Sequence, residues 1–159
     1  GMTIINEGKV DFDILSSSIK RCEKFSKKII IEKFIKGREL TCGILGEESL
    51  PLVEIIPNND FYDYNCKYTK GMSSYVVPPN LPSDISKKIK NFSKAMHLLI
   101  DCQYYSRVDY RLDGDNIYFL EINTLPGLTS TSLLPKAAAS ININYKQLVE
   151  KIINLSLQC

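Results

Sequence analysis

Apolar positions recur along this chain with two different periods, and the period separates expected helices from expected strands. Apolar residues spaced three and four apart predict helices over residues 12–25, 85–99, 133–139 and 145–157. Asp11 is the expected N-cap of the first helix, and Ser83 or Asp84 is the expected N-cap of the second. Single apolar faces of this kind are typical of helices that pack on a sheet or on one another.

Runs rich in β-branched and apolar residues predict strands over residues 29–35, 40–45, 50–56, 104–112 and 117–123. Asp113-Gly114-Asp115 separates the last two and is a strong hairpin signal. Residues 58–82 show weak periodicity, and a loop of that length is usually functional or mobile. Strands and helices do not alternate regularly, which favours an α+β fold with a mainly antiparallel sheet flanked by helices.

Composition narrows the class of protein without indicating a macromolecular partner. A chain of 159 residues with 44% hydrophobic and 24% charged residues suits one soluble domain. A net charge of +2 gives no case for nucleic acid or a membrane as partner. The 5 cysteines are scattered without a Cys-x-x-Cys pair, which fits a reducing cytoplasm better than a disulfide framework or a zinc site. No signal peptide or membrane span is expected, and Gly1 before Met2 is interpreted as a remnant of tag removal.

Two pairs of polar residues lie on the strands of the expected hairpin. Glu121 and Asn123 share one strand face, as do Arg107 and Asp109 on the other strand, because side chains alternate along a strand. A turn of odd length would place both pairs on the same face of the sheet, whereas a two-residue turn would place them on opposite faces. We predict a three-residue turn, 113–115 or 114–116, which brings the four side chains together.

The chemistry of this cluster has two interpretations. Carboxylate and amide oxygens are ligands that Mg²⁺ prefers, and a bound Mg²⁺ keeps positions open for nucleotide phosphates. An adjacent Arg107 can stabilise charge that develops in phosphoryl or acyl transfer. The alternative is that Asp109 and Glu121 only pair with Arg107 on a solvated surface. His97, the single histidine, lies beside the apolar stripe of its helix and is interpreted as a boundary residue rather than a catalytic one.

Several motifs, in the same order, resemble the D-alanine–D-alanine ligases of the ATP-grasp superfamily. The C-terminal signature of that family is similar to Arg107-Val108-Asp109, then Leu120-Glu121-Ile122-Asn123-Thr124-Leu125-Pro126-Gly127, then Thr129-Ser130-Thr131-Ser132-Leu133-Leu134-Pro135. Upstream, Ile31-Glu32-Lys33-Phe34-Ile35-Lys36-Gly37-Arg38-Glu39 resembles its nucleotide-binding strand, and Phe61-Tyr62-Asp63-Tyr64-Asn65-Cys66-Lys67-Tyr68 resembles its active-site loop. The resemblance implies the C-terminal subdomain of an ATP-grasp fold.

The resemblance also implies a role for each matching position. Asp109, Glu121 and Asn123 would ligate two Mg²⁺ ions on the phosphates of ATP. Arg107, Lys67 and the Gly127 backbone would act in catalysis. The nucleotide would be bound by Glu32, Lys33, Phe34, Ile35, Glu39, Phe61 and Leu120, with Glu39 on the ribose hydroxyls. D-Alanine would be bound by Tyr68, Ser132 and Leu133, and one hydroxyl of residues 129–132 would cap the following helix. The implied product is the D-Ala-D-Ala dipeptide for peptidoglycan, made in the cytoplasm through an acyl phosphate.

The chain lacks motifs that the family carries in its N-terminal and central domains. We therefore interpret residues 1–159 as a C-terminal portion that is inactive by itself. One alternative is half of a split ligase that needs a separate N-terminal chain, and another is a non-catalytic remnant that binds nucleotide or a partner. An apolar face left by the missing domains would favour self-association, for example as a homodimer.

Overall fold

The structure is a computed structural model that describes residues 3–5, 11–57 and 73–157. It contains two compact units, Gly1–Ile35 and Lys36–Cys159. In the first unit, α1 (Phe12–Glu23) begins at Asp11, whose carboxylate accepts hydrogen bonds from the backbone N–H groups of Asp13 and Ile14. The expected N-cap is thereby confirmed.

The strand predicted over residues 29–35 is wrong. These residues form no strand, and Ile30 and Ile31 are exposed. A β-branched run becomes a strand only where a neighbouring strand completes its hydrogen bonds. The described part of the first unit offers α1 and irregular chain, so the segment has no strand to pair with.

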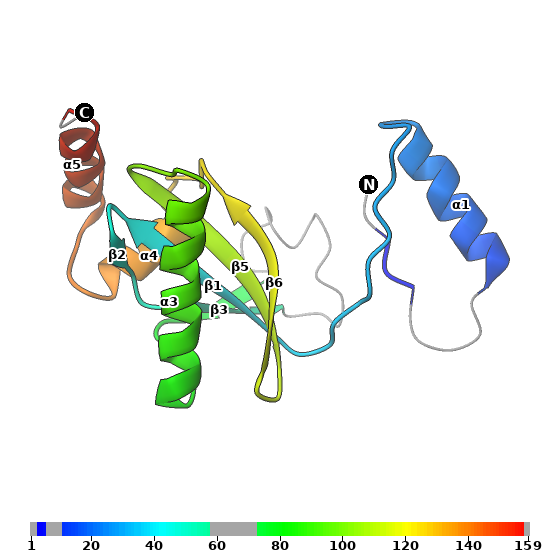
Figure 1. Ribbon diagram of the computed structural model, residues 1–159, viewed down its shortest axis with the longest axis horizontal. Coiled ribbons are helices and arrows are strands. Elements are labelled where there is room, and N and C mark those ends of the chain that lie inside the picture. Colours follow the sequence, from blue (N-terminus) through cyan, green and yellow to red (C-terminus); the bar gives the residue numbers. More distant parts are fainter. Residues whose placement is uncertain (1–2, 6–10, 58–72, 158–159) are drawn as a thin grey trace. The chain divides into compact units, whose positions relative to one another are not determined.

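A six-stranded antiparallel sheet forms the centre of the second unit (Figure 1). Its strands run in the order β4-β3-β1-β5-β6, and β2 pairs with the end of β1. Their bounds are β1 (Arg38–Leu45), β2 (Glu48–Ser49), β3 (Val53–Pro57), β4 (Ser73–Val76), β5 (Tyr105–Asp113) and β6 (Asn116–Asn123). The strand predicted over 50–56 corresponds to β3 and starts later than expected. The strand β4 was not predicted, because its alternation of side chains is only four residues long.

One face of the sheet is covered by α3 (Ser83–Leu99), which lies across the strands in Figure 1. Its buried face packs on an apolar cluster that includes Leu40, Cys42, Ile44, Val108, Tyr110 and Leu112. The N-cap of α3 is Pro82, without a side-chain hydrogen bond, so the predicted cap at Ser83 or Asp84 is wrong. Proline supplies no capping oxygen, but its fixed φ suits the entry into a helix.

Polar groups under α3 are buried as hydrogen-bonded pairs. Ser93 shares a hydrogen bond of 2.8 Å with Tyr110, and His97 Nδ1 lies 2.7 Å from Ser106 Oγ. Burial raises the pKa of Tyr110 to about 12 and that of the Cys42 thiol to about 11, so both are neutral at physiological pH. These hydrogen-bonded groups under α3 are therefore uncharged.

The opposite face is covered at one end by α4 (Leu133–Ala139) and α5 (Tyr145–Ser156). Leu134, Ala137 and Ala138 of α4 and Leu148 of α5 form a second apolar cluster with residues such as Leu50 and Val53. Asn144 begins α5 with a capping box that includes Gln147. The fold is thus α+β, an antiparallel sheet flanked by helices, as predicted. In the described part of the chain, no helix has the length and apolar character needed to cross a bilayer.

Candidate metal and nucleotide site

The predicted polar cluster exists, but the turn that was expected to create it is different. The turn between β5 and β6 consists of Gly114 and Asp115, so the predicted three-residue turn is wrong. A shift of register between Asp109 and Tyr110 compensates, because Tyr110 pairs with Phe119 whereas Asp109 pairs with Glu121. Leu120 is the extra residue of this β-bulge.

The bulge determines which face carries the polar residues of β6. In a regular ladder after the two-residue turn, Leu120 would lie opposite Asp109, and Glu121 would point to the core side. With the bulge, Asp109 lies opposite Glu121 and Arg107 opposite Asn123. The four side chains therefore share the face of the sheet that lies away from α3.

We call this surface the charged face, and its residues are Glu39, Thr41, Arg107, Asp109, Arg111, Glu121 and Asn123. Arg107 donates to both oxygens of Asp109, with Nε–Oδ1 at 2.8 Å and Nη2–Oδ2 at 2.9 Å. Arg111 Nη2 lies 2.9 Å from Glu39 Oε2. Each of these four side chains is 20% exposed or less, so both ion pairs are largely shielded from water, whereas Glu121 on the same face is exposed.

Thr41 lies between these two ion pairs on β1, directly opposite Asp109. Thr41 is 1% exposed, and its hydroxyl has no hydrogen-bond partner among the described residues. A buried hydroxyl without a partner is unusual in a protein interior. It is consistent with a ligand that supplies the missing partner.

The chain after β6 is shaped by short-range hydrogen bonds. Asn123 Oδ1 accepts the backbone N–H of Leu125 at 3.0 Å, which fixes the direction of the amide at the end of the strand. Ser132 Oγ accepts the N–H of Thr129 at 3.1 Å. A Cβ on Gly127 would lie 2.9 Å from Ser132 Oγ, so the backbone at Gly127 approaches this hydroxyl more closely than a side chain permits. Ser132 is the N-cap of α4 by position, but its side chain makes no capping hydrogen bond.

The donor set fits Mg²⁺ by its chemistry. No three His, Cys, Asp or Glu side chains come together as a metal site within the described residues. The set instead combines the two carboxylates of Asp109 and Glu121 with one amide oxygen. Carboxylate and amide oxygens each retain a second lone pair when they accept one hydrogen bond, so the contacts with Arg107 and Leu125 leave them able to bind a cation.

The remaining predicted site residues have three kinds of location. The first unit contains the predicted adenine-binding residues Glu32, Lys33, Phe34 and Ile35. All of these except Ile35 are exposed. Leu120 is the bulge residue of β6 and is half-exposed, and Leu133 is the first residue of α4. Phe61, Lys67 and Tyr68 lie outside the described residues.

Two members of the charged face, Arg111 and Thr41, were not predicted from the sequence. Arg111 follows Asp109 by two residues, and Thr41 follows Glu39 by two, so extending the strand alternation by one step would have found both. His97 is buried rather than at a boundary, and its bond to Ser106 places it on the core side, away from the charged face.

Comparison with known proteins identifies the family. The family described as D-ala D-ala ligase C-terminus matches residues 9–154. This chain belongs to that family. The resemblance found in its motifs is thereby confirmed, and the matched range covers both the charged face and the Ser132 turn that follows it.

Curated relatives carry the same family name. D-alanine–D-alanine ligase from Carboxydothermus hydrogenoformans is 38% identical over 149 residues, which are 91% of this chain and 48% of the relative. The enzyme of that name from Actinobacillus succinogenes is 40% identical, over 94% of this chain and 49% of the relative. The chain thus spans about half the length of the ligases that it matches.

Solved structures of the family share the fold. D-alanine–D-alanine ligase from Bacillus anthracis complexed with ATP has a TM-score of 0.80 and 36% identity, over 93% of this chain and 49% of that protein. VanG D-Ala:D-Ser ligase from Enterococcus faecalis has a TM-score of 0.74 and 29% identity, over 90% of this chain and 43% of that protein. The ATP-grasp fold expected from the motifs agrees with these neighbours.

Proposed function

We propose that this chain carries the metal-binding and nucleotide-binding side of the active site of an ATP-dependent D-alanine–D-alanine ligase, whose product is the D-Ala-D-Ala dipeptide of peptidoglycan. The observation that carries the proposal is the pairing of Asp109 with Glu121 and of Arg107 with Asn123 on one face of the sheet. The family match and the relative solved with ATP support it.

Each residue of the charged face has a physical task in this proposal. Asp109, Glu121 and Asn123 would hold two Mg²⁺ ions, which neutralise the phosphates of ATP during transfer to the first D-alanine. Arg107 is fixed by Asp109 at 2.8 Å and would stabilise negative charge as the second D-alanine attacks the acyl phosphate. A guanidinium held in advance loses little freedom when that charge appears.

The side opposite the metal would hold the second amino acid. Ser132 is bonded to Thr129 by both a backbone and a side-chain contact, so the turn before α4 has a defined shape. We propose that Ser132 and Leu133 bind the carboxylate of the second D-alanine, with the Gly127 N–H on the tetrahedral intermediate. The remaining substrate contacts would come from Lys67 and Tyr68, and the adenine contacts from Glu32, Lys33, Phe34, Ile35, Phe61 and Leu120. We expect a cytoplasmic protein, which the free thiols Cys42 and Cys102 fit.

The ligase reaction itself is a proposal for the whole enzyme, because the chain spans about half of its relatives. The test measures phosphate release from Mg·ATP that depends on D-alanine, with the chain alone and with the N-terminal half of the Bacillus anthracis relative added. We expect activity only with both halves, and we expect Glu121→Gln to abolish it. Glu48→Gln, the same substitution on the exposed strand β2, should leave it intact.

The product distinguishes D-alanine–D-alanine ligase from the D-Ala:D-Ser activity of the VanG neighbour. Replacing the second D-alanine with D-serine or D-lactate should lower the yield of mixed product below that of D-Ala-D-Ala. If the mixture of the two halves releases no phosphate and the chain binds no Mg·ATP, the proposed function is wrong.

A further inference from the structure

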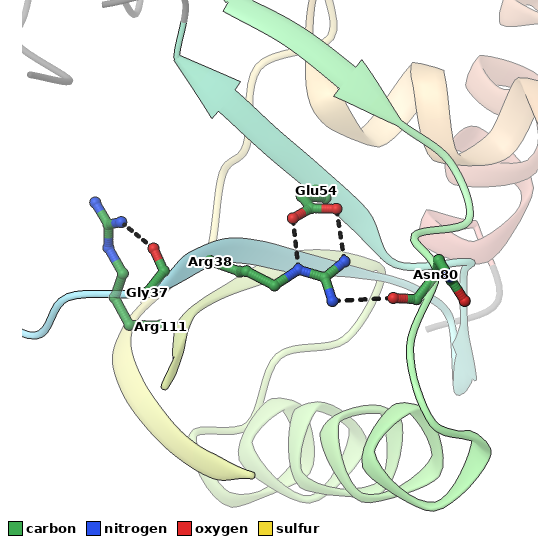
Figure 2. A network of polar contacts seen from close by, with 5 residues as sticks. All are labelled: Gly37, Arg38, Glu54, Asn80 and Arg111. Atoms are coloured by element: carbon green, nitrogen blue, oxygen red, sulfur yellow. Dashed lines mark hydrogen bonds and ion pairs between the residues drawn. The ribbon is translucent and has the colours of Figure 1, made fainter. Parts of the chain in front are cut away.

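Arg111 makes two separate polar contacts with the beginning of β1. Its Nη2 lies 2.9 Å from Glu39 Oε2, and its Nη1 donates to the Gly37 carbonyl at 3.0 Å, the contact that Figure 2 shows. Arg111 and Glu39 are also direct partners in the β1–β5 ladder. One guanidinium therefore fixes both a side chain and the backbone two residues before it.

The backbone that Arg111 contacts has little freedom of its own. Gly37 has a φ of +129°, and a Cβ there would lie 2.2 Å from the carbonyl oxygen of Leu112. Only glycine fits this conformation and this close approach. The direction in which β1 begins is thus set by Gly37, by its packing on Leu112 and by the hydrogen bond from Arg111.

The ion pair has consequences for Glu39 because the carboxylate is poorly solvated. The side chains of Glu39 and Arg111 are 12% and 20% exposed. A shielded carboxylate that loses its cationic partner either turns toward water or is protonated more easily. The ion pair with Arg111 therefore helps to hold Glu39 in its orientation on the charged face.

We propose that Arg111 is a positioning residue for nucleotide binding, which holds Glu39 in the orientation that accepts the ribose hydroxyls of ATP. This inference rests on the proposed function, in which Glu39 binds the ribose. Lysine is not equivalent at this position, because a single ammonium lacks the planar fork that reaches Glu39 and Gly37 at once.

Arg38 provides a matched control on the same strand. It precedes Glu39 and points to the other face of the sheet, where Nε–Oε1 and Nη2–Oε2 contacts of 2.6 and 2.7 Å join it to Glu54 (Figure 2). Its Nη1 also donates to the Asn80 carbonyl at 2.9 Å. Arg38 and Arg111 therefore make the same kinds of contact, a carboxylate and a carbonyl, on opposite faces.

The test compares the affinities of the 159-residue chain for Mg·ATP and Mg·2′-deoxy-ATP by isothermal titration. We expect the unaltered chain to prefer ATP by about tenfold, since a hydrogen bond to a charged group is lost with the 2′-hydroxyl. Glu39→Gln should bring the ratio toward one. Arg111→Gln and Arg111→Lys should lower the ratio in the same direction although Arg111 itself does not contact the ribose.

Arg38→Gln should lower the melting temperature and leave the ratio unchanged. If both Arg111 variants keep the ratio of the unaltered chain while Glu39→Gln loses it, the positioning role is wrong and the proposed function stands. If the unaltered chain binds neither nucleotide, the positioning role is wrong, and if the chain mixed with the N-terminal half also releases no phosphate, the proposed function is overturned as well. A ratio of one in the unaltered chain would overturn the assignment of Glu39 and, with it, that of Arg111.

Discussion

Asp109 of β5 lies directly opposite Glu121 of β6, although the two-residue turn between these strands would by itself place Leu120 there. One extra residue in β6 thus decides whether the carboxylate of Glu121 joins Asp109 or points into the core under α3. β-Bulges are frequent next to functional sites because they redirect side chains in this way.

Cross-linking tests this register directly. With the 5 native cysteines replaced by alanine, we expect Asp109→Cys with Glu121→Cys to form a disulfide on mild oxidation. Direct cross-strand partners have Cβ atoms about 4.5–5.5 Å apart, close to the separation that a disulfide needs. The matched pair is Asp109→Cys with Leu120→Cys, which should stay reduced by thiol titration. Preferential oxidation of this second pair would show a regular ladder without the bulge.

The turn and the bulge also show what the sequence could and could not predict. The alternation correctly placed Arg107 with Asp109 on one face of β5 and Glu121 with Asn123 on one face of β6, but the prediction that both pairs share a face rested on a turn that does not exist. The turn length was wrong because Asp113-Gly114-Asp115 permits more than one turn and the bulge was not considered. The unbroken apolar run Ile117–Leu120 was the available signal, since a strand with one solvated face should alternate.

Helices were predicted better than strands for a physical reason. A helix satisfies its own backbone hydrogen bonds, so the local period and an N-cap such as Asp11 nearly determine it. A strand depends on a neighbour distant in sequence. The run 29–35 had the right composition but no strand to pair with, whereas the short β4 exists because β3 pairs with it.

The Arg38–Glu54 ion pair should stabilise the core side of the sheet. The Glu54 side chain is 11% exposed, and its pairing with Arg38 raises the pKa of that guanidinium. We expect Glu54→Gln to lower the free energy of unfolding by about 1–2 kcal/mol, less than for a fully buried pair because Arg38 is 37% exposed. Urea denaturation measures the change.

Glu150→Gln is the control for that experiment. It removes the same charge from a pair with Lys146 whose side chains are 85% and 55% exposed, and it should cost less than about 0.5 kcal/mol. Equal losses in the two variants would show that Glu54 contributes no more than a surface charge.

Because of His97, the free energy of unfolding should decrease as the pH is lowered. Burial lowers the pKa of His97 below its ordinary value of 6.5, so the unfolded chain binds this proton more readily than the folded one. The stability that neutral, buried His97 contributes is fully present above pH 6.5 and is lost as the pH falls from there toward the lowered pKa. The loss is about 1.4 kcal/mol for each pH unit by which the folded pKa lies below the unfolded one. Unfolding free energies between pH 7.5 and 5.5, chosen to bracket about 6.5, measure this slope.

His97→Gln supplies the comparison, since glutamine can still bond Ser106 and does not titrate in this range. We expect a shallower loss of stability in this variant over the same range. Parallel slopes in the two proteins would mean that His97 is not the group responsible.

The central claim is that the charged face binds a metal–nucleotide complex, and Mn²⁺ in place of Mg²⁺ tests it most directly. With ATP present, substoichiometric Mn²⁺ should broaden the amide NMR signals around Asp109, Glu121 and Asn123 first, and Glu121→Gln should weaken that broadening. Broadening that is centred elsewhere, or that is unchanged in Glu121→Gln, would contradict the account.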